Sequence, residues 1–393
     1  MAQRPEAGGR RLDLANRALG AWPYEIGTQA RFGRVLVPRP GGRRPGPKPV
    51  LPPMLQYCPM GTQTLEHIVD DAGRLSVDHE QLEDRCRGVI LGVAAGNCLG
   101  IPVEGQSASA IRRHHPDGVR DIDPAEHDRP WDDDLAQTVL VAETLLEDSE
   151  LDPDRLAARL LGWSRDNGRG IGVLTRQVLD EIAAGKSAAE ASLEVWEQSG
   201  WSTAGNGAVM RCAPVSLRWR RSGAALVRNA RAGALATHYD ARCEWSTVAF
   251  SVALATTLSG CTVPMDELAS ALEEAAGTDW AAAGVGHVVE AIRQVPKRGL
   301  QELKLDDPMD MGYTLKAMQV GLWCLLQPGE LEPALIGVVS AGGDADTNGA
   351  VAGAALGARA GAQALPRRWL RRIGGAEHLV RLADRLHSTE GND

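Results

Sequence analysis

The chain has 393 residues, of which 44% are hydrophobic, enough for one large domain or two ordinary domains with a substantial core. Aromatic residues make up only 4%, which favours closely packed helices over sheet, because strands prefer β-branched and aromatic side chains. The net charge is −9, but residues 1–50 carry ten Arg and Lys against three Asp and Glu, which leaves −16 on the remainder. This acidic remainder argues against nucleic acid as the main partner.

The sequence also argues against a membrane or secreted protein. We expect no membrane-spanning helix, because no uninterrupted apolar run reaches the required length of about 20 residues. The N-terminus lacks the apolar core of a signal peptide. The seven cysteines are scattered and contain no Cys-x-x-Cys pair, a pattern typical of reduced thiols. These features predict a cytoplasmic protein.

Residues 1–75 are predicted to form an Arg-, Pro- and Gly-rich extension that is partly disordered or a small appendage. The tract 38–53 has the composition of a linker. A basic extension can bind an anionic partner, whereas a dispensable extension is the simpler interpretation. The composition changes near Ser76, so we place the main domain at residues 76–390.

The first element of this domain is a charged helix start that leads into a long apolar helix. Gly88, Gly92 and Gly96 recur at every fourth position of it. This spacing places all three on one face, where another helix can approach closely. Pro102 ends the helix and places Glu104 just beyond it. Glu104 is either an exposed loop acid or part of a site.

Three consecutive acids, Asp132, Asp133 and Asp134, precede the next segment of helical periodicity. Acids in a first turn cap free N–H groups and complement the helix dipole. Three adjacent carboxylates exceed what a cap requires, and they repel one another unless a cation lies among them. The triplet is therefore a candidate metal site.

Helical periodicity continues through most of the remaining chain. The predicted helices are 152–164, 172–184, 188–197, 222–237, 244–259, 264–277, 280–294, 313–326, 332–340, 366–373 and 376–387. We find no strand pattern and no internal repeat. The sequence therefore predicts an all-α fold, a single compact orthogonal bundle of ten or more helices.

A second acidic motif, Gly342-Gly-Asp-Ala-Asp-Thr347, begins a helix rich in small residues. Its paired glycines let the backbone turn sharply and let a ligand approach closely. Two carboxylates and a hydroxyl form an all-oxygen set that suits Mg²⁺ or Mn²⁺. The same pattern also makes a good helix cap, so the motif alone leaves both interpretations open.

Five motifs in this order carry a family resemblance. They are Gly92-x-x-x-Gly-Asn-x-x-Gly-x-x-x-Glu104, Trp131-Asp-Asp-Asp134, Gly205-Asn-Gly-Ala-x-Met-Arg-x-x-Pro214, Thr237-His-x-Asp240 and Gly342-Gly-Asp-Ala-Asp-Thr347. Over residues 83–373 the chain resembles the ADP-ribosylglycohydrolase family, which includes dinitrogenase reductase-activating glycohydrolases and ADP-ribosyl-acceptor hydrolases. The resemblance implies an all-α glycosidase that frees ADP-ribose from a modified acceptor, with two divalent cations, Mg²⁺ or Mn²⁺, at the bottom of its cleft.

The same resemblance implies roles for individual residues. The expected metal ligands are Asp132, Asp133, Asp134, Asp344, Asp346 and Thr347. The expected catalytic residues are Glu104 and Asp344. The expected substrate-binding residues are Gly205, Asn206, Gly207, His238 and Gly343. Glycosidic cleavage passes through an oxocarbenium-like state, so carboxylates beside the sugar ring fit the expected reaction.

Several positions depart from the family pattern. Asp132 and Leu135 replace the two threonines of a Thr-Asp-Asp-Thr signature, and Asn97 replaces an aspartate. Gly170 stands where many members carry an acid that serves the arginine-specific reaction. We expect metal binding to survive, while the acceptor stays open: a protein arginine by default, or a serine, a nucleic-acid end or a small molecule. A catalytically silent ADP-ribose-binding or crystallin-like protein is the alternative from a different class.

Overall fold

The structure is a computed structural model that describes residues 56–57, 64–75, 77–148, 150–276, 281–295, 299–326 and 329–388. Most of the predicted N-terminal extension lies outside these residues. The elements in chain order are β1 (Gln56–Tyr57), α2 (Leu65–Gly73), α3 (His79–Gly100), η1 (Ile101–Val103), α4 (Ala108–His114), η2 (Pro124–His127), α5 (Asp133–Glu147), α6 (Pro153–Asp166), α7 (Val173–Ala183), α8 (Ala188–Gln198), α9 (Ala213–Arg218), α10 (Gly223–Leu235), α11 (Ala241–Leu258), β2 (Cys261–Thr262), α12 (Met265–Ala276), α13 (Ala281–Gln294), η4 (Leu300–Leu303), α14 (Thr314–Leu326), α15 (Leu331–Val339), α16 (Ala345–Ala360), η5 (Ala362–Ala364), α17 (Arg367–Leu370) and α18 (Ala376–Ser388).

Helices make up nearly all of this architecture, which confirms the predicted all-α fold. The two strands are two residues long and pair in parallel, with Gln56 opposite Cys261. Each predicted helix is found, most within three residues of its expected ends. The short helices α4 and α9 were not predicted, because six or seven residues are too few to show a helical period.

Helix α2 lies on the N-terminal side of the domain boundary expected near residue 75, yet it packs against α10 and α11. The Asp70 carboxylate accepts a hydrogen bond of 2.7 Å from the backbone N–H of Gly223 at the start of α10. The compact unit that contains the described residues spans Leu55–Asp393. The boundary near residue 75 stays a prediction.

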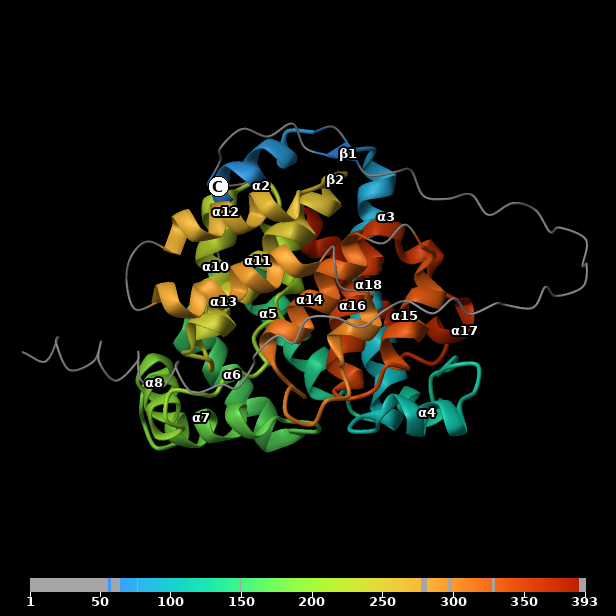
Figure 1. Ribbon diagram of the computed structural model, residues 1–393, viewed down its shortest axis with the longest axis horizontal. Coiled ribbons are helices and arrows are strands. Elements are labelled where there is room, and N and C mark those ends of the chain that lie inside the picture. Colours follow the sequence, from blue (N-terminus) through green and yellow to red (C-terminus); the bar gives the residue numbers. More distant parts are fainter. Residues whose placement is uncertain are drawn as a thin grey trace, which may run out of the picture. The chain divides into compact units, whose positions relative to one another are not determined.

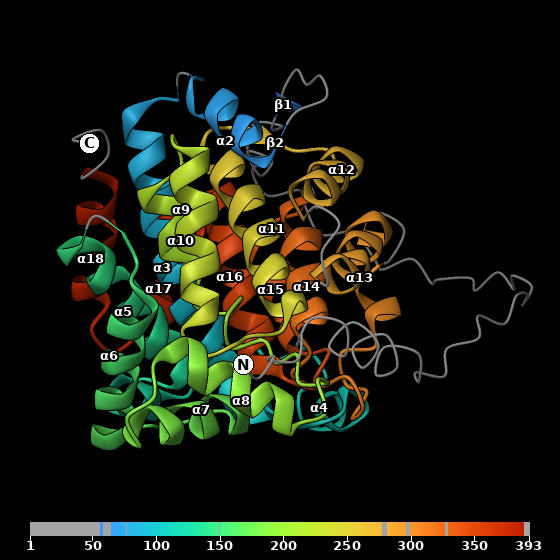
Figure 2. The same cartoon turned by 90° about the vertical axis from the view of Figure 1, so that its left-hand side faces the viewer.

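Within this unit, α2 and the β1–β2 pair lie at one end and α4, α7 and α8 at the other (Figure 1 and Figure 2). Helix α3 runs between the two ends and packs antiparallel to α16 along a seam of glycines. The seam pairs Gly88 with Gly357, Gly92 with Gly353 and Gly96 with Gly349. A Cβ atom on Gly96 would lie 1.8 Å from the carbonyl oxygen of Gly349, so a side chain cannot be accommodated there. The predicted close helix–helix contact is confirmed.

Helix α3 also corrects one expectation. Residues 79–103 are long and apolar enough to cross a membrane by length and composition alone, contrary to the expectation that no such segment exists. Counting uninterrupted apolar residues missed it, because glycine and asparagine interrupt the run without making it strongly polar. In the structure 83% of the apolar stretch is buried inside the protein, as expected for the central helix of a bundle.

The cysteines agree with the sequence analysis in part. Cys86, Cys98, Cys212, Cys243 and Cys324 are free and buried. Cys261 is disulfide-bonded, so the expectation of reduced thiols is wrong for this residue. Sequence spacing does not reveal which cysteines the fold brings together.

We predict that Gly96→Ala lowers the free energy of unfolding by about 3 kcal/mol or more, because α3 and α16 must separate to accommodate the methyl group. The matched control is Gly162→Ala on α6, where a Cβ atom meets nothing within 4 Å. This control should raise the stability by about 0.5–1 kcal/mol, since alanine favours the helix. Urea unfolding of both variants measures the difference. Equal stabilities would contradict the close contact.

Candidate active site

The α3–α16 packing brings the chain just after α3 close to the start of α16. Gly105 N–H donates to the carbonyl oxygen of Gly343, and Gly343 N–H donates to that of Gln106, both at 2.8 Å. Gly342 and Gly343 have φ of +77° and +71°, a region that favours glycine. The sharp turn expected of the paired glycines is confirmed. It places Glu104 beside the acids at the start of α16.

The start of α6 shows the hydrogen bonds that an acidic N-cap residue makes. The Asp152 carboxylate at the start of α6 accepts hydrogen bonds from the N–H groups of Asp154 (2.8 Å) and Arg155 (3.2 Å). Asp132 and Asp344 occupy the equivalent positions of α5 and α16, but neither side chain makes a capping hydrogen bond. Capping therefore does not explain the acids of these two helices.

These acids form two compact sets of carboxylates. Within each set, one carboxylate oxygen of every member lies within 4.8 Å of the others. The α5 set comprises Asp132, Asp133 and Asp134, and the α16 set comprises Glu104, Asp344 and Asp346. Helices α5 and α16 are in contact, and the two sets act on each other electrostatically, since Asp344 raises the pKa of Asp133 and Asp134. The fold thus brings together two helix starts that lie far apart in the sequence.

The buried members of both sets repel one another electrostatically. Burial, followed by the neighbouring charges of Asp132 and Asp344, raises the pKa of Asp133 to about 7. Burial likewise holds the pKa of Asp134 and Asp346 well above the ordinary range of a carboxyl, with neighbouring aspartates adding to the effect. Atom Oδ1 of Asp134 and atom Oδ1 of Asp346 are buried without a hydrogen-bond partner. Buried unpaired oxygens among like charges fit a hard divalent cation, which prefers oxygen ligands.

The loop 205–207 joins the site through Asn206. Its side-chain amide Nδ2 donates to Oδ2 of Asp344 at 2.5 Å, and its backbone N–H donates to the carbonyl oxygen of Gly312 at 3.0 Å. The glycine-rich loop thus lies beside the α16 set, as its predicted substrate-binding role requires. The role itself stays a prediction.

Three other predicted residues lie at this site in less exposed positions. His238 is 2% exposed beneath the loop, where a Cβ atom on Gly207 would lie 2.8 Å from its ring carbon Cε1. Burial and then Arg211 lower the pKa of His238 to about 3, so its ring is neutral. Thr347 is buried in the first turn of α16. Gly343 closely approaches the backbone of Leu305, and direct substrate contacts of His238 and Gly343 stay predictions.

Sequence reasoning missed Arg169, whose positively charged side chain lies beside the α5 set. Arg169 Nε lies 3.6 Å from Oδ1 of Asp132, and Nη1 of Arg169 donates to the buried Glu126 at 2.9 Å. Gly170 follows it with φ of +77°, and a Cβ atom there would lie 2.5 Å from Oδ1 of Asp132 and 2.7 Å from Oδ1 of Asp133. The departure at Gly170 therefore borders the α5 set directly.

The departure at Asn97 also borders the site. Its amide Nδ2 donates to Oδ2 of Asp134 at 3.0 Å, and its own Oδ1 is buried without a hydrogen-bond partner. A neutral amide here adds no further negative charge to the cluster. The substitution thus keeps an oxygen at this position and avoids one more like-charge repulsion.

Comparison with known proteins identifies the family. The sequence model of the family described as ADP-ribosylglycohydrolase matches residues 78–393. The chain belongs to the ADP-ribosylglycohydrolase family. It is therefore a hydrolase of the glycosidase type, and its substrates are ADP-ribosylated.

Relatives of this glycohydrolase cover most of its domain. An uncharacterized protein of Archaeoglobus fulgidus is 31% identical over 78% of this chain and 97% of its own length. The ADP-ribosylarginine hydrolase Tri1 of Pseudomonas putida is 25% identical, covering 78% of this chain and 79% of Tri1. The ADP-ribosylhydrolase ARH3 of Danio rerio is 26% identical, covering 77% of this chain and 90% of ARH3. A solved structure of an ADP-ribosylglycohydrolase-related protein complex covers 79% of this chain and 100% of its own, with 30% identity and a TM-score of 0.61.

We predict that the metal-free protein loses stability as the pH rises. The folded state holds a proton on Asp133 between the ordinary value of 3.8 and about 7, where the unfolded state has released it. The free energy of unfolding in EDTA should therefore fall between about pH 5 and about pH 8. Asp133→Asn should reduce the fall by on the order of 1–3 kcal/mol. Urea titrations of wild type and Asp133→Asn at both pH values test this prediction. Identical pH dependences of the two proteins would refute it.

Proposed function

We propose that this glycohydrolase uses two divalent cations, Mg²⁺ or Mn²⁺, to free ADP-ribose from a modified protein side chain, with arginine as the default acceptor. The supporting observation is that the contacting helices α5 and α16 each begin at a carboxylate set, and that each set has one buried oxygen without a hydrogen-bond partner. The arginine acceptor is proposed because Tri1 of Pseudomonas putida is an ADP-ribosylarginine hydrolase.

The cations would be held by the α5 set together with Asp344, Asp346 and Thr347. When bound, they supply positive charge that orients the vicinal ribose hydroxyls and acidifies a nearby water. The remaining carboxylate charge lies beside the sugar and stabilises the positive charge that develops on its ring. Asn206 fixes the orientation of Asp344 through their 2.5 Å hydrogen bond.

Glu104 is placed to move protons in this reaction. Its side chain reaches the solvent and lies next to Asp344 and Asp346. Neighbouring groups shield it in part from water, and this shielding, followed by the charges of Asp344 and Asp132, raises its pKa. A raised pKa makes a carboxylate a better general base near neutral pH. Glu104 would take a proton from the water whose oxygen adds to C1″. The electron pair of the broken glycosidic bond then goes to the acceptor atom, which takes up the proton that Glu104 received from the water.

The loop 205–207 would hold the distal part of ADP-ribose. It lies beside Asp344, and backbone N–H groups of a glycine-rich loop bind pyrophosphate oxygens well. The N–H of Asn206 already donates to Gly312, so the neighbouring glycines would supply such contacts. His238, neutral and packed under Gly207, would keep the loop in place.

A second candidate acceptor is a serine or another group that is not arginine. Gly170 leaves the α5 set without the acid that many family members carry for the arginine reaction. Arg169 adds a fixed positive charge 3.6 Å from Asp132, which would repel a guanidinium leaving group nearby. These two observations favour a serine or another acceptor that is neutral when released.

An assay of ADP-ribose release tests the proposal. The substrates carry ADP-ribose on arginine, on serine or on a nucleic-acid end, and each is assayed with Mg²⁺, Mn²⁺ or EDTA. We expect metal-dependent release from the arginine substrate, abolished by EDTA. Release from the serine substrate alone would support the second candidate. A thermal-shift assay with ADP-ribose and metal separates a silent binder from a protein without a site. Absence of both release and stabilisation would overturn the proposal.

A further inference from the structure

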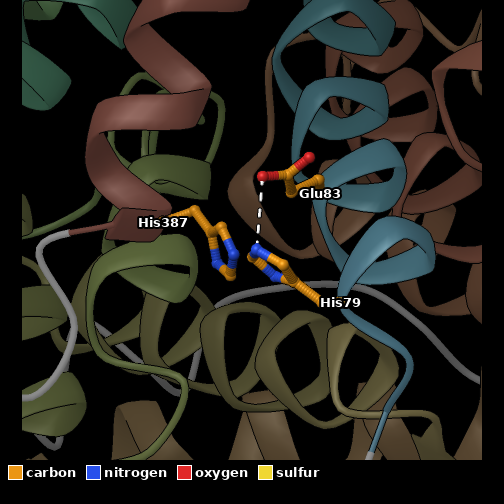
Figure 3. A group of neighbouring side chains, drawn as sticks. All are labelled: His79, Glu83 and His387. Carbon is orange, nitrogen blue, oxygen red and sulfur yellow. Dashed lines mark ion pairs between the residues drawn. The ribbon is translucent and has the colours of Figure 1, made fainter.

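A second group of potential metal ligands lies where the first turns of α3 meet the last turn of α18. His79 and Glu83 come from α3 and His387 from α18, and one donor atom of each lies within 4.8 Å of the others (Figure 3). Nε2 of His79 is 3.5 Å from Oε1 of Glu83. We propose that these three residues bind one divalent transition metal ion of the Zn²⁺ type and thereby join the two helices.

His387 carries the strongest indication of a missing ligand. The residue is 9% exposed, and its Nδ1 is buried without a hydrogen-bond partner. In Figure 3 the His387 ring is turned toward His79 and Glu83, with one nitrogen edge facing them. The centroids of the two imidazole rings are 5.4 Å apart. A metal ion between the three side chains would accept the electron pair of a His387 ring nitrogen.

A neighbouring ion pair fixes the relative position of the two helices. Arg87 donates two hydrogen bonds to the Asp384 carboxylate, at 2.6 and 3.1 Å. Arg87 is one turn after Glu83 on α3, and Asp384 is one turn before His387 on α18. Glu83 directs Oε2 toward Arg87 at 3.5 Å and Oε1 toward His79. The three ligands are therefore held near one another before any metal binds.

The donor set determines the class of metal. Two imidazole nitrogens and one carboxylate oxygen suit Zn²⁺ and related ions, whereas Mg²⁺ prefers oxygen alone. Bonds of about 2.0–2.1 Å in tetrahedral geometry separate ligand atoms by about 3.3 Å. The 3.5 Å between Nε2 of His79 and Oε1 of Glu83 is close to this value, so small side-chain rotations would complete the site. Burial and then the nearby charge of Arg220 lower the pKa of His387, while Glu83 and Asp384 act in the opposite direction.

This site is distinct from the active site. Glu83 and Asn97, the α3 residue that contacts the α5 set, are separated by about 21 Å along the helix at 1.5 Å per residue. No residue of the two carboxylate sets takes part in it. Its expected effect is to hold the C-terminal helix α18 against α3.

Calorimetric titration of the full chain with Zn²⁺ in excess Mg²⁺ tests the proposal. Wild type should bind one more Zn²⁺ than His387→Ala, and Zn²⁺ should raise the melting temperature of wild type but not that of His387→Ala. Glu83→Gln should weaken this binding at least tenfold. His67→Ala, which removes an exposed histidine of α2, should behave as wild type. Co²⁺ should show the visible absorption of imidazole ligation in wild type and lose it in His387→Ala.

Equal Zn²⁺ stoichiometry and affinity in wild type and His387→Ala would overturn the proposal. Circular dichroism in EDTA establishes whether His387→Ala folds. If it does not fold, Glu83→Gln decides, because its side chain is about one-third exposed and its replacement keeps the same size. Unchanged Zn²⁺ affinity in Glu83→Gln would then refute the site.

Discussion

Asp346→Asn is expected to lower the rate of ADP-ribose release at least about 1,000-fold while raising the melting temperature of the metal-free protein. The two effects have one cause, because Asp346 is 4% exposed and carries a buried oxygen without a partner among other acids. Removing its charge relieves repulsion in the empty cluster. It also removes a ligand of the proposed divalent cations. Such ions contribute several kcal/mol to transition-state stabilisation, and about 4 kcal/mol corresponds to a thousandfold in rate.

The experiment measures kcat/KM with saturating Mg²⁺ and melting curves in EDTA and in Mg²⁺. The Mg²⁺-induced rise in melting temperature should be smaller in Asp346→Asn than in wild type. The control is Asp152→Asn, an acid that does cap its helix and is replaced by an equally good cap. It should change neither activity nor stability appreciably. Full activity of Asp346→Asn would exclude the proposed metal ligation.

The sequence predicted the helical framework well because its signals are local. Helical periodicity gave the helices, and glycines at every fourth position of α3 gave the contact with α16. The acids at the starts of α5 and α16 were found, but their function was ambiguous, since a cap and a metal ligand both require acids there. The structure argues against the cap, because Asp132 and Asp344 make no capping hydrogen bond, while the role of metal ligand stays a prediction.

The unpredicted parts of the site depend on contacts between distant segments. Arg169 reaches Glu126 across 43 positions, and Asn206 reaches Asp344 across 138. Helical periodicity specifies which face of its helix a residue occupies. It gives no information about which distant segment packs against that face. The same limitation explains the burial of His238, whose motif indicated proximity to the substrate but not its position beneath the loop.

Glu104→Gln is expected to lower kcat by about 100- to 10,000-fold and leave ADP-ribose binding nearly unchanged. The amide keeps the size of the side chain but cannot accept a proton. Wild-type activity should rise with pH through the pKa of Glu104 in the metal-loaded enzyme, because only the carboxylate acts as a base. This rise should be absent from the residual activity of Glu104→Gln.

Glu274→Gln provides the matched control, since Glu274 is an exposed acid on α12, outside both carboxylate sets. It should keep the activity and pH profile of wild type. Glu104 and Asp346 belong to the same set, so their variants distinguish a base from a ligand. Glu104→Gln should retain the Mg²⁺-induced stabilisation that Asp346→Asn loses. If Glu104→Gln lost that stabilisation as well, Glu104 would act as a metal ligand, and another group would have to accept the proton of the attacking water.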